Sequence, residues 1–518
     1  MHTEGSGYRA NTSRQMAEGG NWRDDSEPEW DLRQRGLLCQ SYHQMAEGGS
    51  WRDESEPQVA PRPSGLHCPN SQFQVHSGNA SVETCIMMNW LGYGPEMRQA
   101  RRDAYREQDR IRNARDDGNM HITTGSKAEG LTRSFESDLD VMLVIRDVLC
   151  IEDGVKSDIL PRENNVFRLS TIMCYPGYCR LLLERSGIMY RVIVDALCDD
   201  EYGRSLLCSD LFVYGFKRIN YGPNVVAHDR AGPSMPSSIN GIWHVDTVFS
   251  IPCHCPSILQ RWAERRRNWP SPAVVQKVVS LGAYVTPVGF KGSQYRHVEW
   301  RICFNTGENE LVGSLNNTQV YVYVILKMVV KEVLKPVNKE ITSYTVKNIV
   351  LWLAENNPQN LFHERSLFVW VCEGLGELRT AILTKRLQYY MIPERNLMGG
   401  CGIAEEQQRS WVATITDMIN DGPKLILRLP KIRQAIISHP EPLMWYSKKR
   451  VELELIVLKC RRRKLQCTDE NGVIDRSDPI YQAIYERMYE ILIEVRQRMN
   501  WEGSRLNDLF EISKMMLS

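Results

Sequence analysis

A glycine-serine pair followed by two closely spaced aspartates constrains this chain more than any other feature. Gly125 and Ser126 precede Asp138 and Asp140, and residues 141–145 that follow are apolar. Side chains alternate across a β-strand, so Asp138 and Asp140 are expected on one face, with the residue between them on the other. Two carboxylates held this close together repel each other unless a cation lies between them.

The aspartate pair therefore predicts a metal site. Mg²⁺ is a hard ion that prefers oxygen ligands and phosphate oxygens, and it suits such a pair. The main-chain amides around Gly125 and the hydroxyl of Ser126 can hold the phosphates of a nucleotide. This layout is typical of a metal-dependent nucleotidyltransferase. The alternative is a surface turn followed by an acidic strand end.

A two-metal phosphoryl-transfer site needs a third carboxylate opposite the first two. Asp246 is a lone acid in the otherwise apolar run of residues 242–249. A buried carboxylate is strongly unfavourable unless it is paired or metal-bound, so Asp246 is the expected third ligand. Asp138 and Asp140 would then bridge two Mg²⁺ or Mn²⁺ ions. A ribose hydroxyl would attack the α-phosphate of a nucleoside triphosphate and release pyrophosphate.

Charge and cysteine content exclude little. The chain has 64 Lys and Arg against 63 Asp and Glu, so any surface for nucleic acid must be local. Its fifteen cysteines and a polar amino terminus indicate reduced thiols and a cytoplasmic location, with the nucleus as the alternative. Charged residues interrupt the longest apolar stretch, so no membrane span is predicted. Residues 253–255, Cys-His-Cys, favour ordinary packing over a metal half-site.

Residues 1–80 differ in composition from the rest of the chain. Residues 15–24 recur almost unchanged as residues 44–53, among many Gly, Ser, Pro, Glu and Arg and few aliphatic residues. Such a segment cannot bury enough apolar surface to offset its ordering entropy, which predicts a disordered tail with a duplicated segment. A binding motif is the alternative. We expect a catalytic lobe at residues 81–310 and a helical lobe at residues 311–518.

The periodicity of apolar residues predicts strands followed by helices. Strand-like runs lie at residues 141–146, 190–196, 242–249 and 300–304. Helical spacing recurs at residues 320–334, 344–355, 368–386, 417–435 and 479–499. The expected fold class is therefore α/β, with a mixed catalytic lobe followed by a helical lobe.

A row of arginines marks a helix predicted at residues 95–117. Arg98, Arg102, Arg106 and Arg110 recur at every fourth position, which keeps them on one side of a helix with a slow drift. Acidic residues are interspersed among them. Two interpretations remain open: a solvated face with internal ion pairs, or a stripe that binds nucleic acid.

Six motifs in this order resemble those of the cyclic GMP-AMP synthase-like receptors and their male-abnormal-type relatives. The similarity covers residues 120–400 and continues more loosely beyond. The motifs are Gly125-Ser126, Asp138-Leu139-Asp140-Val141-Met142, Gly232-Pro233 with Val245-Asp246, Trp300-Arg301-Ile302-Cys303-Phe304, Ser343-Tyr344-Thr345-Val346-Lys347 and Tyr390-Met391-Ile392-Pro393-Glu394. The resemblance implies a bilobal nucleotidyltransferase fold with a mixed sheet and a long N-terminal spine helix.

The resemblance also implies roles for residues whose sequence surroundings are ambiguous. Arg301 is similar to an arginine that contacts base and phosphate, and Lys327 is similar to a lysine that reaches the triphosphate. Ser343 is expected to bond phosphate, Tyr344 to stack on a nucleobase, and Glu308 to contact the nucleotide. Without the resemblance, Arg301 and Lys327 are interpreted as surface charges and Tyr344 as a core aromatic residue.

One departure from the family's pattern bears on the activating ligand. The vertebrate DNA sensor carries zinc-binding histidine and cysteines after the Trp-Arg strand, whereas residues 305–319 here contain neither residue type. No zinc is therefore expected. Invertebrate members without the insertion are similar to this chain, which favours double-stranded RNA as the activator. A-form RNA would be recognised by its shape and phosphates along the arginine row.

The predicted function is a nucleic-acid-sensing nucleotidyltransferase that joins two nucleoside triphosphates, such as ATP and GTP, into a cyclic dinucleotide. The resemblance implies that this product is a second messenger for a downstream receptor in innate immunity. Ligand binding on the spine helix would order the loop of residues 127–137, in which Gly130 permits movement. Two alternatives are a non-catalytic male-abnormal-type scaffold and an enzyme that makes linear oligonucleotides.

Overall fold

The structure is a computed structural model that describes residues 71–115, 118–188, 190–200, 202–217, 224–336, 340–469 and 472–518. The chain divides into two compact units. Only residues 199, 200, 202 and 203 are described in the first unit, Met1–Pro57 with Asp199–Gly203. The second unit, Gln58–Cys198 with Arg204–Ser518, contains the helices and nearly all of the sheet. The duplicated segment of the predicted tail lies outside the described residues, and helix α2 begins at Ser71.

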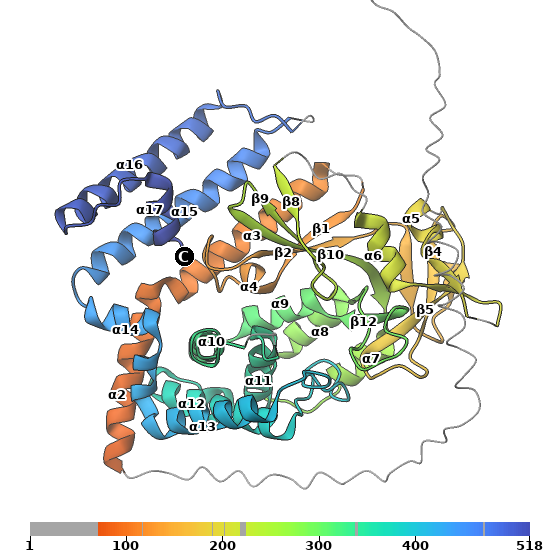
Figure 1. The fold of residues 1–518 in the computed structure, drawn as a ribbon, viewed down its shortest axis with the longest axis horizontal. Helices are drawn as coiled ribbons and strands as arrows, with labels where there is room; N and C mark the ends of the chain where they lie inside the picture. Colours follow the sequence, from red (N-terminus) through yellow and green to blue (C-terminus); the bar gives the residue numbers. More distant parts are fainter. Residues whose placement is uncertain are drawn as a thin grey trace, which may run out of the picture. The chain divides into compact units, whose positions relative to one another are not determined.

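Two helices separated by a sharp bend precede the sheet (Figure 1). Helix α2 spans Ser71–Met88 and helix α3 spans Pro95–Arg115, and the π-helical turn η2, Asn89–Tyr93, joins them. Gly92 in this turn has a φ of 85°, a left-handed conformation that costs glycine little because it has no Cβ. The helix predicted at residues 95–117 is therefore confirmed as the second half of a bent pair.

Among the described residues, twelve strands form one mixed sheet. Its main path runs β1-β2-β10-β11-β12-β5-β4-β3, and β10 also pairs with β3. The strands are β1 (Met120–Thr124), β2 (Leu139–Val144), β3 (Val148–Ile151), β4 (Asn165–Ser170), β5 (Tyr178–Arg185), β6 (Leu197–Asp199), β7 (Ser205–Leu207), β8 (Val225–Ala227), β9 (Met235–Ile239), β10 (Trp243–His254), β11 (Ala283–Thr286) and β12 (Glu299–Cys303).

Within the described residues, helices connect many of the strands and follow the sheet (Figure 1). Within the α/β region they are α4 (Gly125–Ala128), η3 (Ser157–Ile159), α5 (Arg191–Val194), α6 (Ser209–Lys217), α7 (Pro256–Ala263), α8 (Pro272–Leu281) and α9 (Asn305–Ser314). The following helices are α10 (Asn317–Met328), η4 (Val329–Leu334), α11 (Ser343–Asn356), η5 (Gln359–Leu361), η6 (Glu364–Ser366), α12 (Leu367–Thr384), α13 (Glu405–Asp421), η7 (Gly422–Arg428), α14 (Pro430–Ile437), α15 (Leu443–Gln466), α16 (Pro479–Trp501) and α17 (Leu509–Met516).

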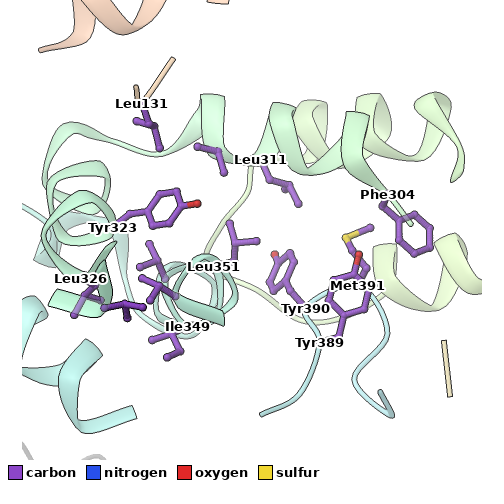
Figure 2. Close-up of a cluster of buried hydrophobic side chains, with 14 of the residues drawn as sticks. Leu131, Phe304, Leu311, Tyr323, Leu326, Ile349, Leu351, Tyr389, Tyr390 and Met391 are labelled. Carbon is purple, nitrogen blue, oxygen red and sulfur yellow. The ribbon is translucent and has the colours of Figure 1, made fainter. Parts of the chain in front are cut away.

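The helices that follow the sheet pack around a shared apolar core (Figure 2). Leu311 of α9, Tyr323 and Leu326 of α10, and Ile349 and Leu351 of α11 are all buried in it. Burial of such helical faces is the main favourable contribution to folding, which is why their spacing could be recognised in the sequence. The fold class, a mixed α/β region with a long N-terminal helix followed by a helical region, is confirmed.

Two element predictions were wrong. Residues 190–196 contain the short helix α5, Arg191–Val194, instead of a strand, and Arg191 pairs with Asp195 across one turn at 3.4 Å. Residues 417–435 do not form one helix, because Gly422, with a φ of 55°, and Pro423 end α13. The chain continues as the 3₁₀-helix η7 and then as α14.

Cys253 and Cys255 lie in the apolar core, as ordinary packing predicts. In the described part of the chain, no helix is both long and apolar enough to cross a membrane.

Substitution of two glycines of α12 tests how tightly the helical core is packed. A Cβ on Gly374 would lie 2.6 Å from Cδ1 of the buried Leu326, whereas a Cβ on Gly376 would meet no atom within 4 Å. Gly374→Val should therefore lower the free energy of unfolding by about 2–3 kcal/mol, the cost of overpacking a core. Gly376→Val, the matched control, should change it by less than about 0.5 kcal/mol. Denaturant unfolding of both variants measures this, and equal losses would contradict the packing described.

Candidate functional site

Asp140 and Asp246 lie side by side on neighbouring parallel strands. The register of β2 and β10 places Asp140 opposite Asp246, so both side chains project from the same face of the sheet. Asp138 is exposed and precedes the first residue of β2. Burial, followed by the carboxylates of Asp246 and Asp138, raises the pKa of Asp140 to about 7. The three predicted acidic residues therefore influence one another electrostatically.

The turn at Gly125 packs directly against this pair. Gly125 has a φ of 65°, and a Cβ added to it would lie 2.2 Å from Oδ2 of Asp140. Only glycine allows the main chain to approach the carboxylate this closely. The Gly125–Ser126 turn and the carboxylates, which are separated in the sequence, thus meet at one place.

The donor set fits a hard divalent cation chemically, although the carboxylates do not converge. Carboxylate oxygens are the ligands that Mg²⁺ prefers, and the carboxylates of Asp246 and Asp138 add to burial in raising the pKa of Asp140. Within the described residues, however, no three His, Cys, Asp or Glu side chains are arranged to hold a metal ion. The assignment of Asp138, Asp140 and Asp246 as metal ligands stays a prediction.

Ser126 and Lys327, both predicted to contact phosphate, are hydrogen-bonded to each other. Nζ of Lys327 donates to Oγ of Ser126 over 2.8 Å. Ser126 belongs to α4 and Lys327 to the last turn of α10, so this contact joins the α/β region to the helical region. Burial lowers the pKa of Lys327. The pair places a hydroxyl beside a charged donor, a combination that suits a phosphate group.

A buried ion-pair network joins the same two regions. Nζ of Lys347 lies 2.9 Å from Oε1 of Glu129 and 2.9 Å from Oε2 of Glu308. Oε1 of Glu308 also accepts hydrogen bonds from the hydroxyls of Tyr344 (2.8 Å) and Tyr389 (2.7 Å). Burial alone would lower the pKa of Lys347, but Glu129 and Glu308 hold it well above its usual value. These three donors leave roughly one acceptor position on the Glu308 carboxylate for the predicted nucleotide contact.

Arg301, Ser343 and Tyr344 lie near this network. Arg301 is half-buried on β12, and its Nε donates to Sγ of Cys303 over 3.4 Å. Burial opposes the charge of Arg301, but Cys303, Tyr178 and then Tyr344 raise its pKa. Ser343 is exposed at the start of α11, and Tyr344 is half-buried. Their predicted contacts with phosphate and base stay predictions.

The four arginines predicted to bind nucleic acid do not form one exposed stripe. Arg98 and Arg102 are only 4% and 9% exposed, and Arg98 donates to Oδ1 of Asn317 over 2.8 Å. Arg106 and Arg110 are exposed, and each pairs with a glutamate. The reason is that a four-residue spacing drifts by roughly 40° per step around a helix, which carries the row from a buried to an exposed face. The prediction is corrected for Arg98 and Arg102.

Sequence reasoning missed Glu129 and Lys347, which hold the two regions together. Lys347 did carry a usable signal, because it is a charged residue within the apolar run of α11 and is flanked by buried residues. The argument that selected Asp246, that a buried charge needs a partner, applies equally to Lys347. Glu129 carried no such signal, because its partners lie far along the chain.

The sheet, its glycine-serine turn and the helices after it define an α/β nucleotidyltransferase domain joined to a helical domain. Residues 214–314 match the family model of the Mab-21 protein nucleotidyltransferase domain, and residues 320–417 match that of the Mab-21 protein HhH/H2TH-like domain. The chain therefore belongs to the Mab-21 family. Comparison with curated proteins gave no match.

The matched segments divide the site unevenly. Asp246, Arg301 and Glu308 lie within the first segment, and Lys327 and Tyr344 lie within the second. The glycine-serine turn and the first two aspartates precede both segments, and helices α14 to α17 follow them.

The close approach of Gly125 to Asp140 can be tested with a matched pair of variants. Gly125 and Gly154 both have a positive φ, but a Cβ on Gly154 would meet no atom within 4 Å. Gly154→Ala should cost about 1 kcal/mol of unfolding free energy through backbone strain alone. Gly125→Ala should cost roughly 1–3 kcal/mol more, because the methyl group displaces the Asp140 carboxylate. Denaturant unfolding measures both values, and equal costs would show that the two residues are not in contact.

Proposed function

We propose that this Mab-21 family protein is a Mg²⁺- or Mn²⁺-dependent nucleotidyltransferase that joins two nucleoside triphosphates, such as ATP and GTP, into a cyclic dinucleotide. The observation that carries the proposal is the pairing of Asp140 with Asp246 on adjacent strands, directly against the Gly125–Ser126 turn. A protein that only binds a partner has no need for carboxylates gathered beside a phosphate-binding turn.

The residues around this pair suit the steps of nucleotidyl transfer. Asp138, Asp140 and Asp246 would hold two metal ions, which when bound neutralise phosphate charge and favour the ionised ribose hydroxyl. Ser126 and Lys327 would orient the triphosphate for in-line attack, with pyrophosphate as the leaving group.

Base recognition would fall to the residues of β12 and α11. Tyr344 would offer its ring to a nucleobase, and Arg301 would contact base and phosphate. Ser343, exposed at the start of α11, would donate to phosphate. Glu308 would contact the nucleotide beside Tyr344, from whose hydroxyl it already accepts a hydrogen bond.

Double-stranded RNA is the proposed activator. On α3 the exposed Arg106 and Arg110 would contact its phosphates, at the expense of their present ion pairs. The cyclic product would act on a downstream receptor in innate immune signalling.

A non-catalytic scaffold is the second candidate, and one observation favours it. The three carboxylates do not converge on a metal position among the described residues. A scaffold could retain the fold of the domain without assembling the site. A third candidate, an enzyme that makes linear oligonucleotides, would use the same residues and differ only in its product.

Product analysis with the four labelled nucleoside triphosphates and Mg²⁺ tests the proposal. The protein should be incubated alone, with double-stranded RNA and with double-stranded DNA. We expect a phosphatase-resistant cyclic dinucleotide with RNA, and none when the metal is chelated. Asp140→Asn should lower the rate by at least about a hundredfold, since it removes a charge that acts at the reacting phosphate. Asp153→Asn, at a carboxylate that is 78% exposed, is the matched control and should leave the rate unchanged.

The outcomes separate the three candidates. Phosphatase-sensitive products would support the linear oligonucleotide synthase. Absence of product under every condition, together with absence of nucleotide binding, would support the scaffold. Full activity of Asp140→Asn would contradict the site itself.

A further inference from the structure

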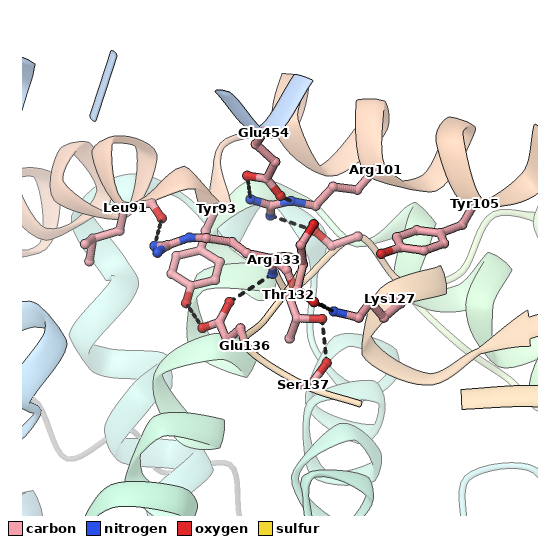
Figure 3. A network of polar contacts seen from close by, with 12 residues as sticks. Leu91, Tyr93, Arg101, Tyr105, Lys127, Thr132, Arg133, Glu136, Ser137 and Glu454 are labelled. Carbon is pink, nitrogen blue, oxygen red and sulfur yellow. Dashed lines mark hydrogen bonds and ion pairs between the residues drawn. The ribbon is translucent and has the colours of Figure 1, made fainter. Parts of the chain in front are cut away.

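The loop that leads from the glycine-serine turn to Asp138 is buried or half-buried, and hydrogen bonds hold it at several positions (Figure 3). Residues 131–134 are buried, and Nζ of Lys127 donates to the main-chain oxygens of Arg133 (2.5 Å) and Ser134 (3.0 Å). Gly130 was expected to permit movement, but it has a second reason to be glycine. Its φ is 74°, and a Cβ there would lie 2.3 Å from the main-chain oxygen of Arg98. The loop therefore sits directly on helix α3.

Glu136, two positions before Asp138, is one anchor of this loop. Its Oε1 accepts hydrogen bonds from the hydroxyl of Tyr93 and from Nζ of Lys431, each over 2.7 Å. Its Oε2 accepts from the main-chain amide of Arg133 over 3.1 Å. Lys431 belongs to α14, so a helix far along the chain holds the residue that introduces strand β2.

A second anchor acts through Arg101 of α3. Nη1 of Arg101 donates to the main-chain oxygen of Gly130 over 3.1 Å. Both carboxylate oxygens of Glu454, on α15, accept from Arg101 over 2.7 Å. The side chains of Arg101 and Glu454 are only 1% and 2% exposed, and Figure 3 shows them beside the loop. This bidentate pair fixes the guanidinium that holds Gly130.

Further contacts come from the last described residues. The amide of Phe135 donates to the main-chain oxygen of Leu517 over 3.0 Å, and Nη1 of Arg133 donates to that of Ser518 over 2.6 Å. These partners, like Lys431 and Glu454, lie beyond residue 417, where the second family match ends. The match to the family thus leaves out the segments that hold the loop.

We infer that Lys431 and Glu454 are positioning residues for nucleotidyl transfer: acting through Glu136 and Arg101, they hold the loop that brings Asp138 to the site. The inference rests on the proposed function. Asp138 is exposed and has no strand partner to fix it, so its position depends on the loop before it. Loss of either anchor should misplace Asp138 while leaving the contact between Ser126 and Lys327 intact.

The first test is amide hydrogen exchange on the full chain, which requires no activity. Lys431→Met should make the amides of residues 130–137 exchange at least about tenfold faster, because local opening of the loop becomes easier. Exchange in α10 and α12 should not change. Lys431→Arg should restore most of the protection. Lys448→Met, the same change at an exposed position of α15, is the matched control and should behave as the wild type.

The second test is steady-state kinetics of the same variants. Lys431→Met should lower kcat by about tenfold or more, as a misplaced catalytic group does, while KM for the triphosphate changes by less than about twofold. Lys431→Arg should recover kcat. An equal change of kcat in the Met and Arg variants would overturn the positioning role.

The two tests fail separately. If the wild type makes no product, the proposed function fails, and the exchange data still decide whether Lys431 holds the loop. Unchanged exchange of residues 130–137 in Lys431→Met would overturn the inference whatever the activity. Faster loop exchange with an unchanged kcat would do so as well, because the anchor would then be only structural. If Lys431→Met does not fold, the double variant Lys431→Met with Glu136→Gln removes the carboxylate that has lost its lysine partner, and it is measured in the same way.

Discussion

The bend between α2 and α3 creates a constraint on which the candidate site depends. Where the helix breaks at Gly92, main-chain oxygens lose their intrahelical partners and must find others. Arginines from three parts of the chain supply them: Arg450 of α15 donates to Trp90, Arg133 of the loop donates to Leu91 over 2.6 Å, and Arg98 of α3 donates to Tyr93 over 2.9 Å. The side chains of Arg101, Arg133 and Arg450 all lie within 4 Å of the position that a Cβ on Gly92 would take. The bend therefore gathers α3, the loop before Asp138 and the later helix α15 around one residue.

The arginines around Gly92 (Arg101, Arg133 and Arg450) form a junction, and this junction and the Lys347 network both support the site. The junction fixes the loop before Asp138, and Lys347 ties Glu129, at the end of α4, to Glu308 of α9. The Gly125–Ser126 turn has Asp140 against it and Lys327 bonded to Ser126. Each support uses a buried charge, and a buried charge is stable only when its partner is in place. The geometry of the turn is therefore sensitive to residues far from it in the sequence.

The parts of this arrangement that could be predicted from the sequence are those set by local pattern. Apolar alternation predicted the strands that carry Asp140 and Asp246, and helical spacing predicted most helices after the sheet. The burial of Arg98 could not be predicted, because its partner Asn317 begins a helix far along the chain. The roles of Lys431 and Glu454 could not be predicted either, because they support a loop that precedes them by hundreds of residues. Residues 190–196 were predicted wrongly because β-branched residues suggest a strand, while the ion pair of Arg191 and Asp195 suits a helical turn.

The carboxylates and the turn are proposed to form one nucleotide site, and every other role assigned to the chain depends on it. The most direct measurement is a crystal structure of the full chain with Mg²⁺ and a non-hydrolysable ATP analogue. We expect the triphosphate between Ser126 and Lys327, with carboxylate oxygens of Asp138, Asp140 and Asp246 all drawn to within about 2.1 Å of a magnesium ion. A nucleotide bound elsewhere, or a crystal grown with saturating analogue in which this site stays empty and Asp138 still points to solvent, would contradict the proposed site.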